Sequence, residues 1–271
     1  RQGEKPFFLL LSYPVPHASL DVPEDSMAKV RPGITGELAS KDGKKSHYKP
    51  VKEVKASYAG MVTRVDDAVG ALLAKLKAKG MDENTLVLFS SDNGSHMEGG
   101  YSYEMLDSNG VLRGGKRDLY EGGIRVPLIA RWPAGVPAGR VTDYPSAFWD
   151  FMPTACELLE IKPPAGIDGI SYAATLTGKG AQAAHPSLYW EFHELGGRRA
   201  LRTGDWKLVQ YGLEPGKLGQ CELYDLANDL SENNDLSQKD PQRVASMLKE
   251  MNSARHPNER FPLPGLDSLG K

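Results

Sequence analysis

The sequence has very few cysteines, and their positions exclude most of the chemistry that cysteine supports. Only two occur among the 271 residues, Cys156 in TACELLE and Cys221 in GQCELYD. Neither lies in a CxxC pair or in another spacing typical of a metal site. The pattern therefore predicts two buried or free thiols, not a disulfide or a redox pair.

The sequence also lacks an excess of charge and any long hydrophobic run. The formal net charge is −2 and the sequence pI is near 6.4, so no basic surface for nucleic acid is expected. The apolar runs are far too short to cross a bilayer, and we expect no membrane partner. With 40% apolar and 25% charged residues, the composition predicts a globular protein with one sizeable core, or with one core and a smaller domain.

No initiator methionine and no signal-peptide core stand at the start of the sequence. A short polar stretch leads directly into PFFLLLSYP. The consecutive large apolar residues at positions 7–11 predict a strand buried on both faces, as in a parallel sheet. We expect the chain to be an inner or later part of a longer protein.

Three segments follow the first predicted strand. Residues 21–50 are rich in Pro, Gly, Lys and Asp without an apolar period, which predicts a long, lid-like loop. Apolar residues then recur at three- and four-residue spacing over residues 58–76, which predicts an amphipathic helix that stops at Gly80. Residues 85–90 predict a second buried strand. Strand, helix and strand in this order are typical of a parallel α/β sheet.

Polar side chains follow both predicted strands. Asp92 and Asn93 come directly after residues 85–90 in SSDNGSH, and His17 follows the first strand in YPVPHASL. Ligands of open α/β sheets bind beyond the carboxyl ends of the strands. A hard divalent cation prefers carboxylate and carbonyl oxygens, which Asp92 and Asn93 would supply. The alternative is an ordinary Asp-Asn-Gly turn, because these residues tolerate left-handed backbone angles.

A glycine-flanked lysine lies farther along the chain, in RGGKRDLYEGGIRVPLIARWP. The ammonium of Lys116 suits an anion, since it is a mobile point charge with three donors; a solvated loop lysine is the alternative. We interpret Glu121 and Arg125 as a brace of this turn that does not touch substrate. His96 either points into a cleft or lies in a solvent-facing turn. Residues 126–130 predict another strand.

The sequence changes character after residue 180. Short strand candidates at residues 188–192, 199–202, 206–211 and 222–224 are separated by Gly, Asp and Pro turns, which predicts a small antiparallel sheet. A helix over residues 241–253 follows, with an inner stripe of Val244, Met247, Leu248 and Met251. We therefore predict two domains, residues 1–180 and residues 181–271.

Several of these segments together resemble the later part of a type I sulfatase of the alkaline-phosphatase-like superfamily. They are PHASL, YAGMVTRVDDAVGALLAKLKAKGMDENTLVLFSSDNG, RGGKRDLYEGGIRVPLIARWP and YPSAFWDFMPTACELLEI, in this order. The resemblance implies an α/β fold: the C-terminal part of a mixed, mainly parallel sheet flanked by helices, followed by a small antiparallel-sheet subdomain with a C-terminal helix. It also implies a periplasmic, secreted or lysosomal location.

The resemblance implies roles for the candidate residues. Asp92 and Asn93 match metal ligands, usually for Ca²⁺, with Mg²⁺ as the alternative. Lys116 matches a lysine that binds the sulfate group, and His17 matches a histidine that can protonate the leaving alcohol. His193, in YWEFHELGGRRALRTGDWKLV, is a candidate substrate contact, and a surface turn residue is its alternative. The expected substrate is a small-molecule or carbohydrate sulfate ester.

Two features of the family are missing from the sequence. Sulfatases attack with a formylglycine made from Cys or Ser inside a Cys/Ser-x-Pro/Ala-x-Arg motif, and no Cys or Ser of this sequence has that context. The paired aspartates that complete the family's metal site are missing as well. The resemblance therefore implies an N-terminal part of the same protein that carries the nucleophile, and a chain that is inactive by itself.

Two other function classes stay open. A phosphatase, phosphodiesterase or phosphoglycerol transferase on the same scaffold would also use a metal and cationic donors, although no further His and Asp set for a second metal is evident. A non-catalytic module that binds an anion or a carbohydrate is the other class, because the nucleophile is absent.

Overall fold

The computed structural model describes residues 5–40 and 47–267, and these form two compact units. The first unit takes its residues from Arg1–Lys79 and His96–Ser108, the second from Gly80–Ser95 and Asn109–Lys271. Within the described ranges, no helix is both long and apolar enough to span a bilayer. The predicted division of the chain at residue 180 stays a prediction.

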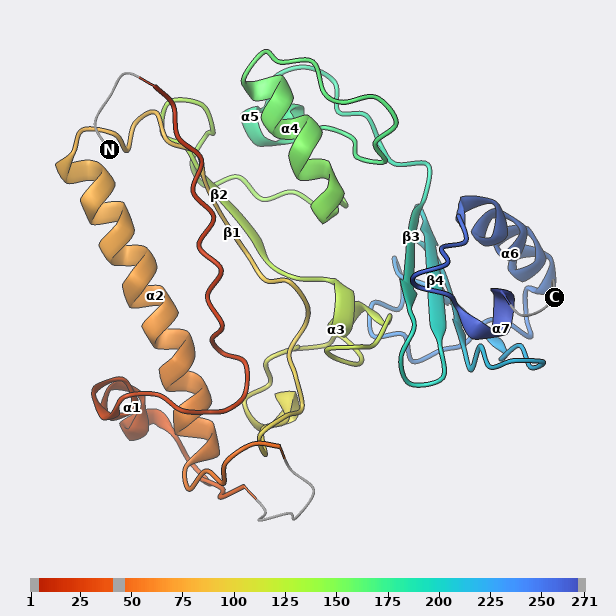
Figure 1. Ribbon diagram of the computed structural model, residues 1–271, viewed down its shortest axis with the longest axis horizontal. Helices are drawn as coiled ribbons and strands as arrows, with labels where there is room; N and C mark the ends of the chain where they lie inside the picture. Colours follow the sequence, from red (N-terminus) through yellow and green to blue (C-terminus); the bar gives the residue numbers. More distant parts are fainter. Residues whose placement is uncertain (1–4, 41–46, 268–271) are drawn as a thin grey trace. The chain divides into compact units, whose positions relative to one another are not determined.

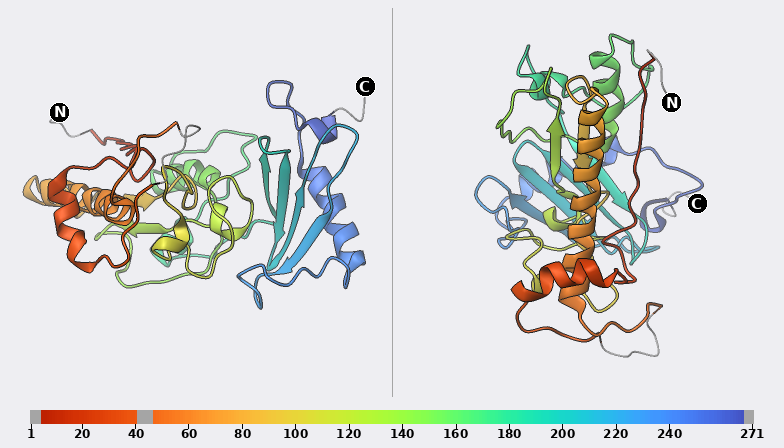
Figure 2. Two further views of the ribbon diagram at one scale, coloured as in Figure 1. Left: turned by 90° about the horizontal axis from the view of Figure 1, so that it is seen from below. Right: turned by 90° about the vertical axis from the view of Figure 1, so that its left-hand side faces the viewer.

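The longest helix of the first unit is α2, Val54–Ala78 (Figure 1). The helix predicted at residues 58–76 is thus confirmed. It ends just before Gly80, whose φ of +65° lies in the left-handed region that stops a helix. The short helix α1, Glu24–Val30, crosses α2 (Figure 2), and a Cβ added at Gly60 would lie 3.3 Å from the backbone nitrogen of Met27. Gly60 therefore permits the close approach of the two helices.

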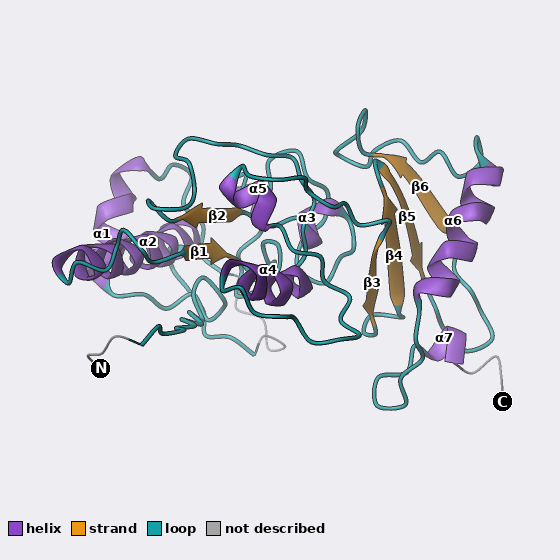
Figure 3. Cartoon of the chain, turned by 90° about the horizontal axis from the view of Figure 1, so that it is seen from above, coloured by secondary structure: helices purple, strands orange, loops and turns teal. Residues whose placement is uncertain are grey.

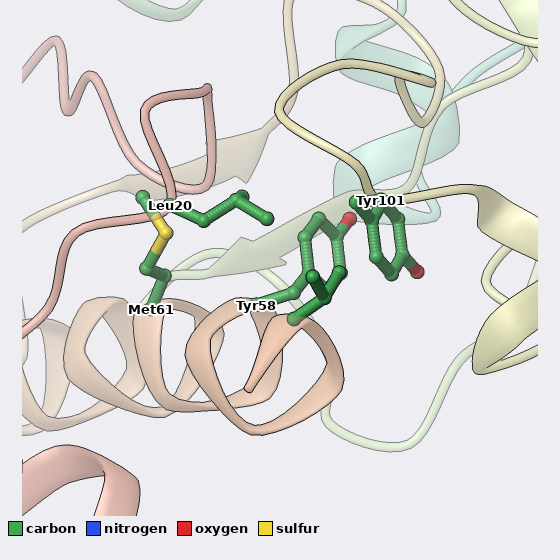
Figure 4. Packing of buried hydrophobic residues seen from close by; sticks show 5 residues of the cluster. Leu20, Tyr58, Met61 and Tyr101 are labelled. Atoms are coloured by element: carbon green, nitrogen blue, oxygen red, sulfur yellow. The ribbon is translucent and has the colours of Figure 1, made fainter. Parts of the chain in front are cut away.

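Apolar side chains from three segments form the core of the first unit (Figure 4). These buried residues are Leu20, Val54, Tyr58, Met61 and Tyr101. The rings of Tyr58 and Tyr101 stack with centroids 3.7 Å apart and an interplanar angle of 5°. Since each fully buried apolar side chain stabilises a fold by about 1.5–3 kcal/mol, this cluster ties α2 to the segments around Leu20 and Tyr101.

Two predictions in this unit are wrong. Residues 7–11 do not form a strand, and Phe8 and Leu10 are 74% and 73% exposed. An apolar run is buried as a strand only where neighbouring strands and a covering layer enclose it. Residues 21–50 are not a plain loop either, because they contain α1 and a 3₁₀ turn, Arg31–Gly33; positions 41–46 of that segment lie outside the described residues.

Arg31 explains why α1 forms in a segment without an apolar period. Its guanidinium lies 2.6 Å from Glu24 Oε1 of α1 and 2.8 Å from Glu53 Oε1, directly before α2. These contacts join the two helices through charge, which a search for hydrophobic spacing does not detect. A second 3₁₀ turn of this unit, Tyr103–Met105, follows the segment around Tyr101.

The second unit contains a two-stranded sheet of β1, Val87–Ser90, and β2, Leu128–Arg131. The strands predicted at residues 85–90 and 126–130 are therefore present. The burial predicted for residues 85–90 is wrong, since Phe89 is 38% exposed. The parallel partner predicted for this strand in residues 7–11 is wrong as well: β1 pairs antiparallel with β2, where Leu128 and Ile129 are 43% and 59% exposed. Pairing direction depends on the path of the chain between strands, which the strand residues do not encode.

A buried aspartate organises the segment after β2. The 3₁₀ turn Phe148–Asp150 leads into α4, Phe151–Leu158, and α5 spans Ala173–Thr177. Asp150 is fully buried; its carboxylate accepts hydrogen bonds from the backbone nitrogens of Ala147 at 2.7 Å and Ile170 at 2.9 Å. His185 Nε2 lies 2.8 Å from the same carboxylate, so one side chain joins both ends of the segment.

A four-stranded antiparallel sheet follows, in the order β3-β4-β5-β6 (Figure 3). Its strands are β3 Leu188–Phe192, β4 Arg198–Thr203, β5 Trp206–Tyr211 and β6 Cys221–Asp225. Helix α6, Pro241–Ala254, packs against the sheet, and α7, Pro264–Asp267, comes after it. The predicted small antiparallel sheet with a C-terminal helix is confirmed.

Alternate residues of the sheet belong to two different apolar clusters, one on each face. Leu201, Leu208 and Leu223 pack with Met247 and Met251 of α6, on which Val244 and Leu248 complete the predicted inner stripe. Ala200, Val209 and Tyr224 pack with Leu119 on the other face. Both cysteines are free, as predicted.

Candidate active site

The candidate metal ligands lie in the loop that follows β1. Asp92 is exposed and Asn93 is half-buried. Ser91 Oγ donates a hydrogen bond to the carbonyl of Asn93 at 2.8 Å, and Asn93 Nδ2 donates to the carbonyl of Gly94 at 3.0 Å. The amide nitrogen of Asn93 is thereby engaged by the loop itself, and its oxygen is the atom suited to bind a cation.

Glycines allow this loop to pack against the short helix α3, Glu121–Ile124. The backbone nitrogen of Gly94 donates to the carbonyl of Gly123 at 3.0 Å. A Cβ at Gly94 would lie 1.7 Å from the carbonyl oxygen of Gly122, and a Cβ at Gly122 would lie 2.4 Å from that of Gly114. Any side chain at these positions would separate the backbones. The glycines of DNG and EGG are therefore required by close packing.

Lys116 occupies a tight turn that precedes α3 in the chain. Asp118 closes the turn: its backbone nitrogen donates to the carbonyl of Gly115 at 2.8 Å, and its Oδ2 accepts from the Gly115 nitrogen at 3.1 Å. Arg198 of β4 donates to Asp118 Oδ1 at 2.9 Å and to the carbonyl of Arg117 at 3.0 Å. The four-stranded sheet therefore holds the turn that presents Lys116.

A backbone hydrogen bond joins the two loops directly. The nitrogen of Lys116 donates to the carbonyl of Ser95 at 2.8 Å. Together with the bond between Gly94 and Gly123, it places the Asp92–Asn93 loop and the Lys116 turn side by side in the second unit. The sequence predicts these residues as one group, and the structure brings three of them, Asp92, Asn93 and Lys116, into neighbouring loops.

Glu121 and Arg125 form the predicted brace. Arg125 Nη1 lies 3.6 Å from Glu121 Oε2, and the backbone nitrogen of Arg125 donates to the Glu121 carbonyl at 2.7 Å. Burial acts to raise the pKa of Glu121, but attraction to Lys207, Arg202 and Arg125 outweighs it and holds that pKa below its ordinary value. Glu121 is therefore an ionised, buried group.

His17 lies in the first unit. Its ring is exposed; Nδ1 lies 2.6 Å from the carbonyl of Ala18, and Nε2 lies 3.4 Å from Glu98 Oε2. A carbonyl only accepts hydrogen bonds, so Nδ1 is the donor in the first contact. Nε2 is then the nitrogen that faces outward from the turn toward the carboxylate.

His96 is buried, so the solvent-facing alternative for this residue is wrong. It is 5% exposed; Nε2 lies 2.8 Å from the carbonyl of Pro16, and Nδ1 accepts from the backbone nitrogen of Glu98 at 3.1 Å. His96 therefore fixes the turn that carries His17 and the backbone next to Glu98. The role of Glu98 was not detectable from the sequence, because it depends on a contact across about eighty positions of chain.

His193 follows β3 directly. Its Nε2 lies 3.4 Å from Glu191 Oε2, and its ring centroid lies 6.2 Å from that of Phe261. The next residue, Glu194, lies 3.9 Å from Nε of Arg117, the chain neighbour of Lys116. The loop of His193 therefore reaches the Lys116 turn within the second unit.

The donor set fits a hard cation only in part. Ca²⁺ takes about six to eight oxygen ligands, and Asp92 and Asn93 supply a carboxylate and an amide oxygen from one loop. In the part of the chain that the structure describes, no group of three or more His, Cys, Asp and Glu residues could hold a metal. Asp92 and Asn93 would thus provide two ligands of a larger set.

Comparison with known proteins identifies the chain's relatives. The Sulfatase family model matches residues 1–161, and a model described as N-sulphoglucosamine sulphohydrolase, C-terminal, matches residues 114–256. Steryl-sulfatase of Homo sapiens is 33% identical over 193 residues, which are 70% of this chain and 29% of that protein. N-acetylgalactosamine-6-O-sulfatase of Bacteroides thetaiotaomicron is 28% identical over 212 residues, 72% of this chain and 41% of that protein.

Solved structures give the same result. The crystal structure of Ps i-CgsB in complex with k-i-k-neocarrahexaose is 30% identical and superimposes with a TM-score of 0.73, covering 93% of this chain and 50% of that one. The chain therefore corresponds to half or less of each of these three relatives. The Sulfatase model matches more than half of the chain, including Asp92, Asn93 and Lys116, and the chain belongs to the sulfatase family.

Proposed function

We propose that the chain forms part of a hydrolase of sulfate esters, with a sulfated carbohydrate as its substrate. The observation that carries the proposal is the pair of backbone hydrogen bonds that sets the Asp92–Asn93 loop beside the Lys116 turn, in a chain of the sulfatase family. A carboxylate, an amide oxygen and an ammonium in neighbouring loops suit a metal ion and the anion bound to it.

Lys116 would bind the sulfate oxygens. Negative charge gathers on these oxygens during attack on sulfur, and a positioned cation stabilises that charge more strongly in a site shielded from water. The turn fixed by Asp118 and Arg198 would keep the Lys116 backbone in place when substrate binds.

His17 would donate the proton that the leaving alcohol needs. The contact of Nδ1 with the Ala18 carbonyl orients the ring, and Nε2 would act as the general acid. Glu98 Oε2 lies 3.4 Å from Nε2, on the side of the ring that would face the leaving group.

Two further groups belong to the proposal. Asp92 and Asn93 would hold a Ca²⁺ ion, or Mg²⁺, which supplies positive charge for the sulfate group. In sulfatases the nucleophile is formylglycine, which would supply the attacking hydroxyl. The 271 residues contain no Cys/Ser-x-Pro/Ala-x-Arg motif, so no residue of this sequence is assigned that role.

The proposed substrate class follows from two relatives. One is named for sulfate on N-acetylgalactosamine, and a solved structure that matches 93% of the chain is in complex with k-i-k-neocarrahexaose. A third relative is named for steryl sulfate, so a steroid ester is the competing substrate. His193 is the proposed substrate contact among the residues of the sheet, since its loop reaches the Lys116 turn.

The test is sulfate release by the whole protein that contains this chain. The panel should hold sulfated galactose and N-acetylgalactosamine oligosaccharides, a steryl sulfate and the matching phosphate esters. We expect turnover of a sulfated sugar, a loss of about 10²- to 10³-fold in kcat for Lys116→Ala, and a loss of about 10²- to 10⁴-fold for His17→Ala.

Matched controls separate chemistry from folding. Lys179→Ala and His256→Ala make the same substitutions at exposed positions, and both should retain the rate of the parent protein. Faster hydrolysis of the phosphate esters would assign the protein to phosphoryl transfer instead. Binding of sulfated sugar without any turnover would favour the non-catalytic module.

A further inference from the structure

Three charged side chains meet in the interior of the second unit, at the start of the helix α3 that packs against the candidate loops. Lys207 of β5 and Glu232 are fully buried, and Glu121 of α3 is 2% exposed. Lys207 Nζ lies 2.9 Å from Glu121 Oε1 and 2.9 Å from Glu232 Oε1. Buried charges are costly unless they are paired, so this cluster must be held in one arrangement.

The contacts of the cluster differ in kind. Lys207 donates a hydrogen bond to Glu121, whereas Glu232 Oε1 attracts Lys207 without hydrogen-bond geometry. The other oxygen of Glu232 accepts a hydrogen bond from the backbone nitrogen of Glu121 at 2.6 Å. Glu232 therefore binds the first backbone amide of α3, and Lys207 binds the first side chain of that helix.

The protonation preferences of the two carboxylates are opposite. Attraction to Lys207 and its neighbours holds the pKa of Glu121 below the ordinary value despite burial. Burial raises the pKa of Glu232 and outweighs the attraction to Lys207. Glu121 is thus the carboxylate that Lys207 neutralises, and Glu232 acts mainly as a hydrogen-bond acceptor for the helix amide.

Helix α3 is also the element on which both candidate loops rest. Its residue Gly122 donates to the carbonyl of Arg113 at 2.8 Å, at the start of the segment that carries Lys116. Its residue Gly123 accepts from the nitrogen of Gly94, directly after Asn93. Neither glycine has room for a Cβ, so α3 packs directly against the backbones of both loops. A shift of α3 would therefore move both loops.

We propose that Lys207 and Glu232 are positioning residues that fix α3, and through it the Asp92–Asn93 loop and the Lys116 turn. Apolar residues of similar volume could join α3 to the sheet without loss of stability, but they would not specify a single position along the sheet. The four-stranded sheet, through Lys207 of β5, thereby holds the two candidate loops in position by charge. The functional meaning of the two loops rests on the proposed function.

Amide hydrogen exchange in this chain tests the proposal without any need for activity. In Lys207→Met, the amides of Glu121, Gly122 and Gly94 should exchange at least tenfold faster than in the parent chain. The control is Met251→Ala, which opens the core on the α6 face of the same sheet. The two variants are compared under conditions in which both have lost the same free energy of unfolding. The three amides should then exchange much more slowly in Met251→Ala than in Lys207→Met.

A milder variant covers the case in which Lys207→Met does not fold. Glu232→Gln keeps an oxygen for the Glu121 amide and removes only the charge, so it should accelerate the same amides less than Glu232→Ala. Equal protection of Gly94 and Gly122 in Glu232→Ala and in the control would overturn the proposal. So would faster exchange spread evenly over the sheet and α3.

Kinetics of the whole protein then separate this inference from the proposed function. If the protein releases sulfate, Glu232→Ala should lower kcat/KM at least tenfold, and Glu232→Gln should restore most of the loss. Intact kcat/KM in Glu232→Ala would show that the cluster is merely structural. A parent protein without sulfatase activity would contradict the proposed function, while the exchange result would still decide whether the cluster holds the two loops.

Discussion

The two sheets of the second unit carry similar apolar strands but bury them very differently. Strands β1 and β2 leave Leu128 and Ile129 43% and 59% exposed. In the four-stranded sheet, Leu201 and Leu208 are fully buried, because α6 covers one face and the segment around Leu119 packs on the other. The difference shows that an apolar strand is buried by what covers it, whatever its own composition.

The comparison also separates stability from function within this unit. The four-stranded sheet has its own core and anchors α3 and the Lys116 turn through charged groups. The β1–β2 pair delivers Asp92 and Asn93 at the end of β1. Stability should therefore be concentrated in the larger sheet, while the smaller one serves to place the loop that follows it.

The largest expected effect is the loss of a buried leucine in the larger sheet. Leu208→Ala should reduce the free energy of unfolding of this chain by about 2–5 kcal/mol, because it removes apolar contacts and leaves a cavity. Urea denaturation followed by far-UV circular dichroism measures the change. A loss below about 1 kcal/mol would mean that the sheet's core repacks freely, and it would remove the contrast between the sheets.

The next effect concerns the buried charge cluster. Glu121→Gln should cost about 1–3 kcal/mol, because it removes the carboxylate whose pKa is lowered by Lys207 and leaves the lysine with less compensation. Glu232→Gln should cost less, since burial already disfavours the charged form of that residue. The same denaturation experiment ranks the two variants, and the reverse order would contradict the assigned roles.

The pH dependence of stability gives a smaller effect with a definite sign. The pKa of Glu232 is raised above its ordinary value of 4.5, so its contribution to stability is fully present below pH 4.5 and is lost as pH rises through the native pKa. As the pH falls through the native pKa toward 4.5, the parent chain should gain stability relative to Glu232→Gln, by at most about 1.4 kcal/mol per pH unit. A parallel pH dependence in both proteins would show that Glu232 does not titrate in this range.

The smallest effect is expected on the smaller sheet. Ile129→Ala removes a side chain that is 59% exposed, and it should change the free energy of unfolding by no more than about 0.5 kcal/mol. Its melting temperature can be measured beside that of Leu208→Ala. A cost similar to that of Leu208→Ala would show that the two sheets are equally stabilising.

Local patterns in the sequence predicted the elements that depend on local periodicity. The helix at residues 58–76 and the strands and helix after residue 180 were all found at their predicted positions. Residues 7–11 and the pairing of β1 with β2 could not be predicted in this way. The burial of a strand and the direction of its pairing depend on segments far away in the chain. The apolar composition of the strand itself does not predict either.

The candidate site shows the same limit. The sequence singled out Asp92, Asn93 and Lys116, and the hydrogen bonds at Gly94 and Lys116 set their loops side by side. It missed Lys207, which reads as an ordinary polar residue of a strand. Its partner Glu121 lies 86 positions earlier, and only the folded chain brings the two together. The roles of these residues in catalysis stay predictions.

If the Asp92–Asn93 loop and the Lys116 turn act as one sulfate-ester site, the effects of substitutions in the two loops depend on each other. A double-mutant cycle in the whole protein tests this dependence most directly, with kcat/KM measured for the parent, Asp92→Ala, Lys116→Ala and the double variant on one sulfated sugar. We predict that the fold-loss of kcat/KM in the double variant is at least ten times smaller than the product of the fold-losses in the two single variants. Losses that multiply fully, or a parent protein that releases no sulfate, would contradict the account.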